Sequence, residues 1–172
     1  MEKWQTGDIP AFEALFRQYE KVVFKNAFLI TGRREDAEDV LQEVFTSVWK
    51  SRHTFDPNKG KLSTWLHRIT VNECLRKRRR EPPASISLDG IDIADKQTPM
   101  EDKVDNQMDY ERLTNAMESL DAKHRAVLVL RYFNDLSYDE VAQAVGVPLG
   151  TVKSRINHAL KALRTRLGDQ DL

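Results

Sequence analysis

The stretch 137–167 constrains the fold of this chain most, because its pattern predicts two helices joined by a tight turn. Ser137 followed by Glu140 is a capping box, which marks the start of a helix. Gly146 suits the positive φ of a helix end, and Pro148 cannot continue a helix. The second helix then carries an apolar stripe at helical spacing, made of Val152, Ile156, Ala159, Leu160, Leu163 and Leu167. The pattern predicts a helix-turn-helix.

Short hydrogen-bonding groups and cations occupy the start of the second helix away from this stripe. They are Thr151, Lys153, Ser154, Arg155, Asn157 and His158, with no acid among them. A helix-turn-helix enters the major groove with this end of its second helix. Arg and Asn have the geometry for bidentate bonds to guanine and adenine, whereas Lys and Ser suit phosphates. We favour recognition of duplex DNA over the alternative, a helical hairpin whose basic face is merely solvated.

The composition limits the remaining possibilities. A chain of 172 residues is long enough for one large or two small domains, and its formal net charge of zero gives no whole-chain argument for nucleic acid. The single cysteine, Cys74, excludes an internal disulfide and a cysteine-based zinc site. No apolar run approaches the roughly 20 residues that span a bilayer, and the first residues are not a signal peptide. We expect an all-α, cytoplasmic protein without membrane insertion, metal or cofactor.

Two helices are expected before residue 53. The first starts at Asp8 and Pro10, ends at Gly32, and has apolar residues at helical spacing. These are Phe12, Leu15, Phe16, Tyr19, Val22, Val23, Ala27 and Ile30. The second runs over about 35–52 with a core face of Ala37, Val40, Leu41, Val44, Phe45 and Val48. Its opposite face carries Asp36, Asp39, Glu43, Thr46 and Lys50, which suits either plain solvation or a docking surface.

A loop over 55–61 and a third helix reaching about residue 80 follow. Trp65, Leu66 and Ile69 are expected to face inward, and Arg68, Asn72, Arg76 and Arg79 to share another face. The helix ends in five successive cations at 76–80, beside Phe55 and Trp65, which are either exposed aromatic residues or part of the core. Cations that track phosphates and rings that stack on bases suit a single strand. Trp65 fits the core and a base contact equally well, whereas the cation run favours nucleic acid because nothing structural requires it.

The chain divides into three parts by composition. Residues 1–81 form the first domain, and residues 82–107 form an acidic linker with Pro and Gly but without helical period. Residues 108–172 form the second domain, in which Leu113, Met117 and Leu120 share one helix and Asp121 caps the next. Val127, Leu128 and Leu130 are expected to be buried there.

Three blocks of this sequence resemble a bacterial sigma factor of the extracytoplasmic-function group, in the sigma-70 family. DAEDVLQEVFTSVWK (36–50) resembles sigma region 2.2, and FDPNKGKLSTWLHRITVNECLRKRRR (55–80) resembles regions 2.3 and 2.4. HRAVLVLRYFNDLSYDEVAQAVGVPLGTVKSRINHALKALR (124–164) resembles regions 4.1 and 4.2. The blocks stand in the family's order with a linker between them, so the resemblance covers nearly the whole chain.

The resemblance implies a role for each surface of an alternative sigma factor. The face with Asp36, Asp39, Gln42, Glu43 and Trp49 would dock the clamp helices of the RNA polymerase β′ subunit, and the second domain would contact the β flap. A second set would melt and hold the promoter −10 element: Phe55, Asn58, Lys59, Trp65, Arg68, Asn72, Arg76 and Arg79. The helix start at 151–158 would recognise the −35 element as duplex, led by Lys153 and Arg155. An anti-sigma factor would hold the protein inactive.

Three other functions compete with this interpretation. A polymerase-independent regulator with a helix-turn-helix explains the second domain but not the acidic row that precedes the aromatic and basic stretch. An enzyme built on His53, His67, His124 or His158 is disfavoured, because the histidines are scattered and no phosphate loop, H-E-x-x-H or G-x-S-x-G motif occurs. An RNA-binding adaptor would leave the duplex-reading helix unused. We therefore expect no catalysis and no small-molecule substrate.

Overall fold

The computed structural model describes residues 3–80 and 115–167, and all regular structure in these two ranges is helical, as predicted. The first range holds the 3-10 helix η1 (Lys3–Thr6), α1 (Ile9–Thr31), α2 (Arg34–Ser51), the 3-10 helix η2 (Arg52–Thr54) and α3 (Leu62–Arg80). The second opens with helical residues 115–118, followed by α5 (Ala122–Leu128), the π-helix η3 (Val129–Phe133), α6 (Tyr138–Val145) and α7 (Leu149–Leu167). The expected linker over 82–107 and the helix start near Met108 lie outside the described residues. None of the described helices is long and apolar enough to cross a membrane.

Helix α1 begins and ends where its sequence signals predict. The Asp8 carboxylate accepts a hydrogen bond from the Ala11 amide at 2.9 Å, which satisfies one of the free donors of the first turn. Gly32 ends the helix at a φ of 84°, and its amide donates to the Phe28 carbonyl. Val22, one of the apolar residues at helical spacing, does not pack in the core, because its side chain is 40% exposed. The packed face passes through Val23, which lies about 100° further round the helix.

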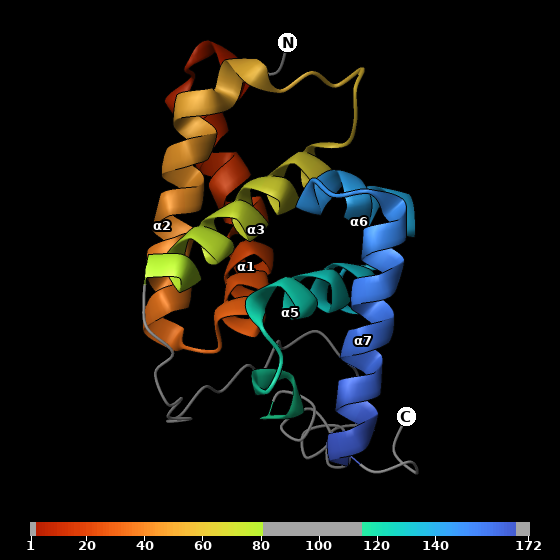
Figure 1. The fold of residues 1–172 in the computed structure, drawn as a ribbon. Coiled ribbons are helices and arrows are strands. Elements are labelled where there is room, and N and C mark those ends of the chain that lie inside the picture. The colour runs from red at the N-terminus through yellow and green to blue at the C-terminus, as the bar shows by residue number, and fades with distance from the viewer. Residues whose placement is uncertain (1–2, 81–114, 168–172) are drawn as a thin grey trace, which may run out of the picture.

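The first half is a bundle in which α1 and α2 lie side by side and α3 crosses them (Figure 1). The predicted core face of α2 is confirmed: Ala37, Val40, Val44, Phe45 and Val48 are buried, and Leu41 is partly buried. Leu66, Val71 and Cys74 bring α3 into the same core, while Trp65 and Ile69 are only partly buried.

Helices α6 and α7 form the predicted helix-turn-helix. Both bonds of the capping box are present, because the Ser137 hydroxyl accepts from the Glu140 amide at 3.2 Å and the Glu140 carboxylate accepts from the Ser137 amide at 2.9 Å. Gly146 closes α6 at a φ of 67°, and α7 begins at Leu149, one residue before Gly150, which with Thr151 was expected to open the helix. Asp121 caps α5 as predicted, through the His124 amide at 2.9 Å.

The two halves pack into one body. Helix α6 lies against α3, and α5 lies against α1 and α3, as Figure 1 shows. The buried apolar residues of both halves form one continuous cluster that runs from Trp4 to Leu163. The central residues of α5 and η3, Ala126 to Leu130, are each at most 2% exposed. The joint between the halves is therefore part of the core of the described structure.

Candidate functional site

The N-terminal part of α7 presents the predicted DNA-reading side chains on the face away from the core. Lys153, Ser154, Asn157 and His158 are exposed, and Thr151 and Arg155 are partly buried. The opposite face is closed, because Val152, Ile156 and Ala159 are each at most 1% exposed. Within residues 3–80 and 115–167, no hydrogen bond or ion pair engages the side chain of Lys153, Arg155 or Asn157. Their donors are thus held in place by packing beneath them and remain available to a ligand.

His158 stacks on His124, a contact that the sequence did not predict. The ring of His158 lies parallel to that of His124 in α5, with 6.4 Å between centroids and 6° between planes. His124 Nδ1 is in turn 2.9 Å from the Asp121 carboxylate that caps α5. These residues are far apart in the sequence, so no local pattern marks the pair.

The loop 55–61 is anchored by an aromatic cluster rather than open to solvent. Phe55 is 8% exposed, and its ring lies 5.9 Å from that of Trp4 and 5.6 Å from that of Trp65. The expectation that Phe55 is an exposed aromatic is therefore wrong. The cause is η1, since the Gln5 side-chain amide donates to the Phe55 carbonyl at 2.7 Å and Trp4 covers the ring. Trp65 is partly buried in the same cluster, so it belongs to the core in part, and its base contact stays a prediction.

A cavity of about 470 Å³ lies between this loop and α3. The loop contributes Lys59 and Lys61, and the helix contributes Trp65, Arg68 and Asn72. Helix α6 of the other half adds Gln143 to its wall. Cations, an amide and a partly exposed indole are the groups that hold a phosphodiester strand and its unpaired bases. Asn58 stands at the loop tip, where its backbone amide donates to the Asp56 carboxylate at 3.0 Å and fixes the turn.

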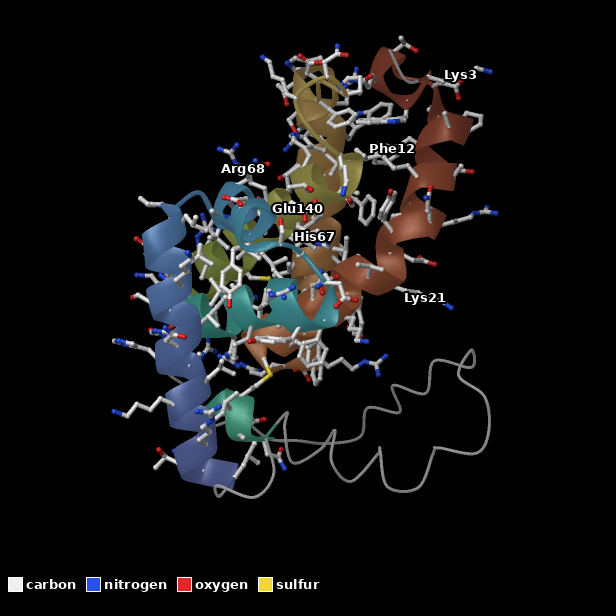
Figure 2. All side chains as sticks on the ribbon, turned by 90° about the vertical axis from the view of Figure 1, so that its right-hand side faces the viewer. Lys3, Phe12, Lys21, His67, Arg68 and Glu140 are labelled. Atoms are coloured by element: carbon white, nitrogen blue, oxygen red, sulfur yellow. The ribbon has the colours of Figure 1, made fainter. Side chains whose placement is uncertain are left out.

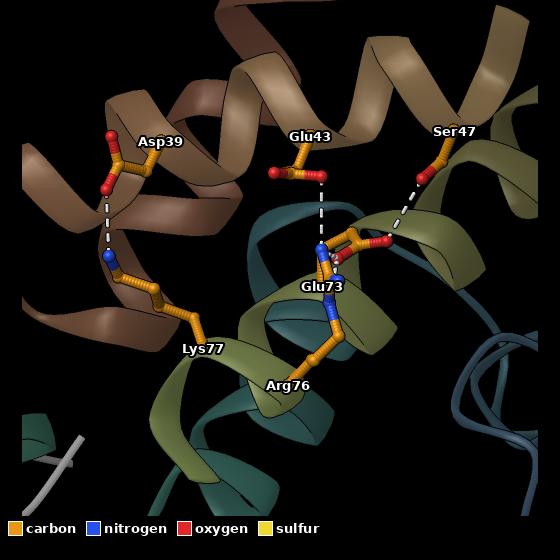
Figure 3. Close-up of polar contacts among 6 residues, drawn as sticks. All are labelled: Asp39, Glu43, Ser47, Glu73, Arg76 and Lys77. Carbon is orange, nitrogen blue, oxygen red and sulfur yellow. Dashed lines mark hydrogen bonds and ion pairs between the residues drawn. The ribbon is translucent and has the colours of Figure 1, made fainter. Parts of the chain in front are cut away.

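The acidic row of α2 is paired with the basic end of α3 (Figure 3). Lys77 Nζ is 2.8 Å from the carboxylate of Asp39 and 3.5 Å from that of Asp36. Arg76 bonds Glu73 at 2.7 Å and Glu43 at 3.1 Å. Asp36 is only 2% exposed, so its expected place on the solvent face of α2 is wrong. It starts the helix at the edge of α3, where Lys77 compensates its buried charge.

The cations in the run 76–80 therefore have different environments. Arg76 and Lys77 join α3 to α2, so the argument that nothing structural requires the run is wrong for these two residues. Arg79 and Arg80 are exposed, and Arg68 and Asn72 are exposed nearer the cavity. Arg76 consequently faces the acidic row and is separated from the group with which its spacing predicted it would act.

The expected docking face on α2 also includes Gln42 and Trp49. Gln42 is exposed next to Glu43. Trp49 is partly buried between the ring of Phe12, 4.9 Å away, and the guanidinium of Arg52, 4.5 Å from its centroid. The structure thus places an acidic and amide surface on α2, a basic cavity beside α3 and an acid-free helix tip on α7.

Each half of the chain matches a known protein family. Residues 15–82 match the family profile of sigma-70 region 2, and residues 116–165 match that of sigma-70 region 4. The ECF RNA polymerase sigma factor RpoE of Cereibacter sphaeroides is 33% identical over 93% of this chain and 88% of its own length. SigW of Bacillus subtilis is 30% identical over 95% and 92%. SigE of Mycolicibacterium smegmatis is 35% identical over 94% of this chain, which spans only 65% of that longer protein.

Two solved structures share the fold. CnrH, in complex with the cytosolic domain of CnrY, superposes with a TM-score of 0.68 at 23% identity over 96% of this chain and 93% of its own. The sigma factor RpoE of Bartonella quintana, in complex with the anti-sigma factor NepR, gives 0.69 at 22% identity over 92% and 98%.

Proposed function

The chain belongs to the extracytoplasmic-function group of RNA polymerase sigma factors, and from this premise we propose how its surfaces divide the work of initiation. Members of this family are DNA-binding initiation factors that act with the polymerase. We propose a promoter-recognition device with three parts: one for core polymerase, one for opened −10 strand and one for duplex −35 DNA.

The uncommitted tip of α7 is the single observation that carries the proposal most strongly. Lys153 and Arg155 lead the −35 contacts, with Thr151, Ser154, Asn157 and His158 around them. A guanidinium reads guanine through two parallel hydrogen bonds, whereas an ammonium binds phosphate or base as a point charge. These donors need no internal partner to be displaced before they bind DNA. The buried stripe beneath them fixes their register on the groove.

The cavity beside α3 is proposed to take the unpaired bases of the −10 element. Lys59, Arg68 and Arg79 would follow the strand's phosphates, while Asn58 and Asn72 offer amides to base edges. Trp65 and Phe55 both line this cavity, and Trp65 is the more exposed of the two. Phe55 thus supports the site from within the core. Extruding a base costs a few kcal/mol, which stacking and hydrogen bonds in such a cavity offset.

Core polymerase is proposed to dock on the α2 row, through Asp39, Gln42, Glu43 and the adjoining Trp49. Asp39 and Glu43 are exposed although each forms an ion pair. A carboxylate has about four acceptor sites, so each can still accept hydrogen bonds from a partner. Basic side chains of the β′ clamp helices would bind them, and residues 108–172 would contact the β flap. The division into domains 1–81 and 108–172, joined by 82–107, assigns one domain to each promoter element.

An anti-sigma factor is proposed as the regulating partner. The two neighbours of similar fold were solved bound to CnrY and to the anti-sigma factor NepR, which shows that such a surface exists on those proteins. The shared fold offers this chain a comparable place for such a partner. A purified anti-sigma factor should then compete with core polymerase for the chain.

The direct test is transcription by purified core polymerase with and without this chain, followed by sequencing of the RNA 5′ ends. The proposal predicts a new set of start sites that share two sequence elements upstream. A chain that shifts no start site and does not co-purify with core polymerase would be a polymerase-independent regulator instead.

The docking surface has its own variant. Asp39→Ala is expected to weaken core binding by about tenfold, or about 1.4 kcal/mol, because it removes one carboxylate from an interfacial charge pair. Glu38→Ala is the matched control, because Glu38 is exposed on the neighbouring position but pairs with Arg34 at 2.9 Å. Fluorescence anisotropy with labelled chain measures both. Equal affinities for the two variants would contradict the assignment of the docking face.

A further inference from the structure

The 3-10 helix η1 packs on the start of the loop 55–61, which lines the cavity beside α3. We propose that η1 is a positioning element for this loop: Trp4 and Gln5 hold the loop in the shape in which it receives an opened DNA strand. The inference rests on the proposed function of the cavity and adds two residues to it. Neither residue falls in the range 15–82 that matches the profile of sigma-70 region 2.

The loop itself contributes little that could attach it to the bundle. Among positions 55–61 only Phe55 is buried, and positions 57–61 are all exposed. The Asp56 carboxylate accepts from the Asn58 backbone amide at 3.0 Å, which shapes a local turn but makes no bond to a helix. The position of the loop therefore depends on what packs against Phe55 at its start and on α3 at its end.

Trp4 contacts both ends of this loop. Its ring centroid lies 5.9 Å from that of Phe55 at the start and 6.0 Å from that of Trp65 in the first turn of α3. The centroids of Phe55 and Trp65 are 5.6 Å apart, so each ring contacts the other two. Trp4 is only 5% exposed, and tilted aromatic pairs at such distances stabilise beyond the area that they bury. Trp4 thus sets the distance between the two ends of the loop.

Gln5 fixes the backbone at the point where the loop begins. Its side-chain amide has two N–H groups, and it donates to the Phe55 carbonyl at 2.7 Å and to the Arg52 carbonyl at 3.2 Å. The bond to Phe55 is buried, so a carbonyl left unpaired there would cost more than an ordinary hydrogen bond contributes. One amide therefore holds η2 and the start of the loop together.

The two sides of η1 differ in their surroundings. Trp4 and Gln5 are buried on the side of the loop, whereas Lys3 and Thr6 are exposed. The Gly7 amide donates to the Trp4 carbonyl at 3.2 Å, and the chain then turns back into α1. Figure 2 shows η1 at one end of α1, with the labelled side chain of Lys3 pointing outward. The exposed side therefore supplies matched control positions within the same short helix.

A loop that is already held in one shape binds a strand more tightly than a loop that must first be ordered. Ordering a flexible segment on binding costs conformational entropy and lowers the affinity. The loop supplies Lys59 and Lys61 to the cavity, and α3 supplies Arg68 and Asn72. Because η1 fixes the loop relative to α3, that entropy is lost during folding instead. The affinity for an opened strand should thus depend on η1, although the described residues that line the cavity include none from it.

Limited proteolysis tests the positioning in the free chain. Trypsin cuts after Lys59 and Lys61 only when the loop leaves its folded shape, so the rate of these cuts reports the open population. Gln5→Met keeps the size of the side chain and removes both donors, and it should raise this rate about tenfold. Thr6→Ala, on the exposed side of η1, should leave it unchanged. Cutting after Lys161 of α7, followed in the same digest by mass spectrometry, is the internal standard.

Strand binding is measured by anisotropy with a fluorescein-labelled single-stranded DNA of mixed sequence, about 15 nucleotides long. The free chain and its complex with core polymerase are both titrated, below the unfolding midpoints of all variants. Gln5→Met and Trp4→Ala should bind about tenfold more weakly than the wild type. Trp4→Phe keeps a ring against Phe55 and should recover most of the affinity. All variants should bind a duplex of the same sequence equally, because α7 is unaltered.

A second control separates positioning from stability. Val44 is 0% exposed and lies about two turns before the end of α2, so Val44→Ala lowers the stability of the same half at a distance from the loop. This variant should bind the single strand like the wild type. A loss of strand binding equal to that of Gln5→Met would show that affinity follows stability alone, and it would overturn the proposal.

The remaining outcomes separate η1 from the proposed function. Unchanged cutting of the loop in Gln5→Met overturns the positioning role, and so does unchanged strand affinity in that variant. If Trp4→Ala does not fold, Gln5→Met and Trp4→Phe still decide the question. Failure of core polymerase to bind the wild-type chain counts against the proposed function, whereas the measurements on the free chain still test the role of η1.

Discussion

The two surfaces that we propose bind DNA differ in how many of their charged side chains already form ion pairs within the chain. At the tip of α7, Lys153 and Arg155 make no internal ion pair among the described residues. Along α3, Arg76 pairs with Glu43 and Glu73, and the cavity mouth is bridged by Lys61 and Glu140. In the proposed division of labour, duplex DNA would displace no ion pair of the described residues at the tip of α7. An opened strand would first have to displace the Lys61–Glu140 pair at the cavity.

The largest expected effect tests whether the halves form one body. Ile156→Ala in α7 removes a side chain that is 1% exposed and should lower the free energy of unfolding by about 2–5 kcal/mol. All three tryptophans, Trp4, Trp49 and Trp65, lie in the first half, so their fluorescence reports that half alone. We expect the urea midpoint of tryptophan fluorescence to fall in this variant. An unchanged midpoint, with circular dichroism showing that α7 has unfolded, would mean that the halves are independent.

The second-largest expected effect is a gain in stability at the joint between the two halves. Arg125→Met replaces a buried cation with an apolar side chain of similar length and should raise the unfolding free energy by about 1–4 kcal/mol. The physical reason is the desolvation of Arg125 next to Arg78, which already depresses its pKa to about 10. Chemical denaturation measures the change, and Arg131→Met, which alters a partly buried arginine of η3, is the comparison. Strong destabilisation by Arg125→Met alone would show that this cation supports the joint.

Recognition by the open surface should be sensitive to one guanidinium. Arg155→Ala is expected to cost about 1–3 kcal/mol in binding to promoters with the preferred −35 sequence, because a bidentate base contact has that value. Run-off transcription on promoters with intact and altered −35 elements measures it. Arg166→Ala, at an exposed position in the last turn of the same helix, should leave the preference intact. A variant Arg155→Ala that still discriminates between the two promoters would remove Arg155 from the −35 contacts.

The smallest effect concerns pH. Burial lowers the pKa of His67, so the neutral ring is favoured in the folded state. The unfolded chain then binds the proton more readily, and the stability contributed by neutral His67 is present above its usual pKa of 6.5 and lost as the pH falls below it. Tryptophan-monitored unfolding should show a lower midpoint at about pH 5.5 than at about pH 7.5. His67→Gln should reduce this difference, and a difference of the same size in that variant would show that another group causes it.

Local structure could be predicted wherever residues within a few positions of one another determine it. The Asp8 and Asp121 caps, the Ser137–Glu140 box and the ends at Gly32 and Gly146 all depend on neighbours within a few residues. The exposed tip of α7 followed from helical periodicity alone, because a buried stripe determines which face remains. For the same reason the acidic face of α2 was found, although its first member is buried.

Contacts between segments that are far apart in the sequence could not be predicted from sequence patterns. Phe55 is buried by η1, about 50 positions away, through Trp4 and Gln5. Arg76 is turned from the cavity by Glu43, and the joint joins Asn26 to Asn134 across 108 positions. Charge pairing and burial at this range depend on how the helices pack, and several packings suit the same periodicity. The contact of α6 with the cavity beside α3 was therefore visible only in the structure.

Energy transfer between dyes on the two halves tests most directly the central claim, that each half serves a different promoter element within the polymerase complex. Gln18 of α1 and Lys161 of α7 are exposed positions for introduced cysteines, while the native Cys74 is fully buried and its thiol is protected from labelling. The account predicts efficient transfer in the free chain and a large loss of transfer when core polymerase binds, in proportion to the appearance of promoter-specific transcripts. Transfer that stays equally efficient in a transcribing complex would contradict it.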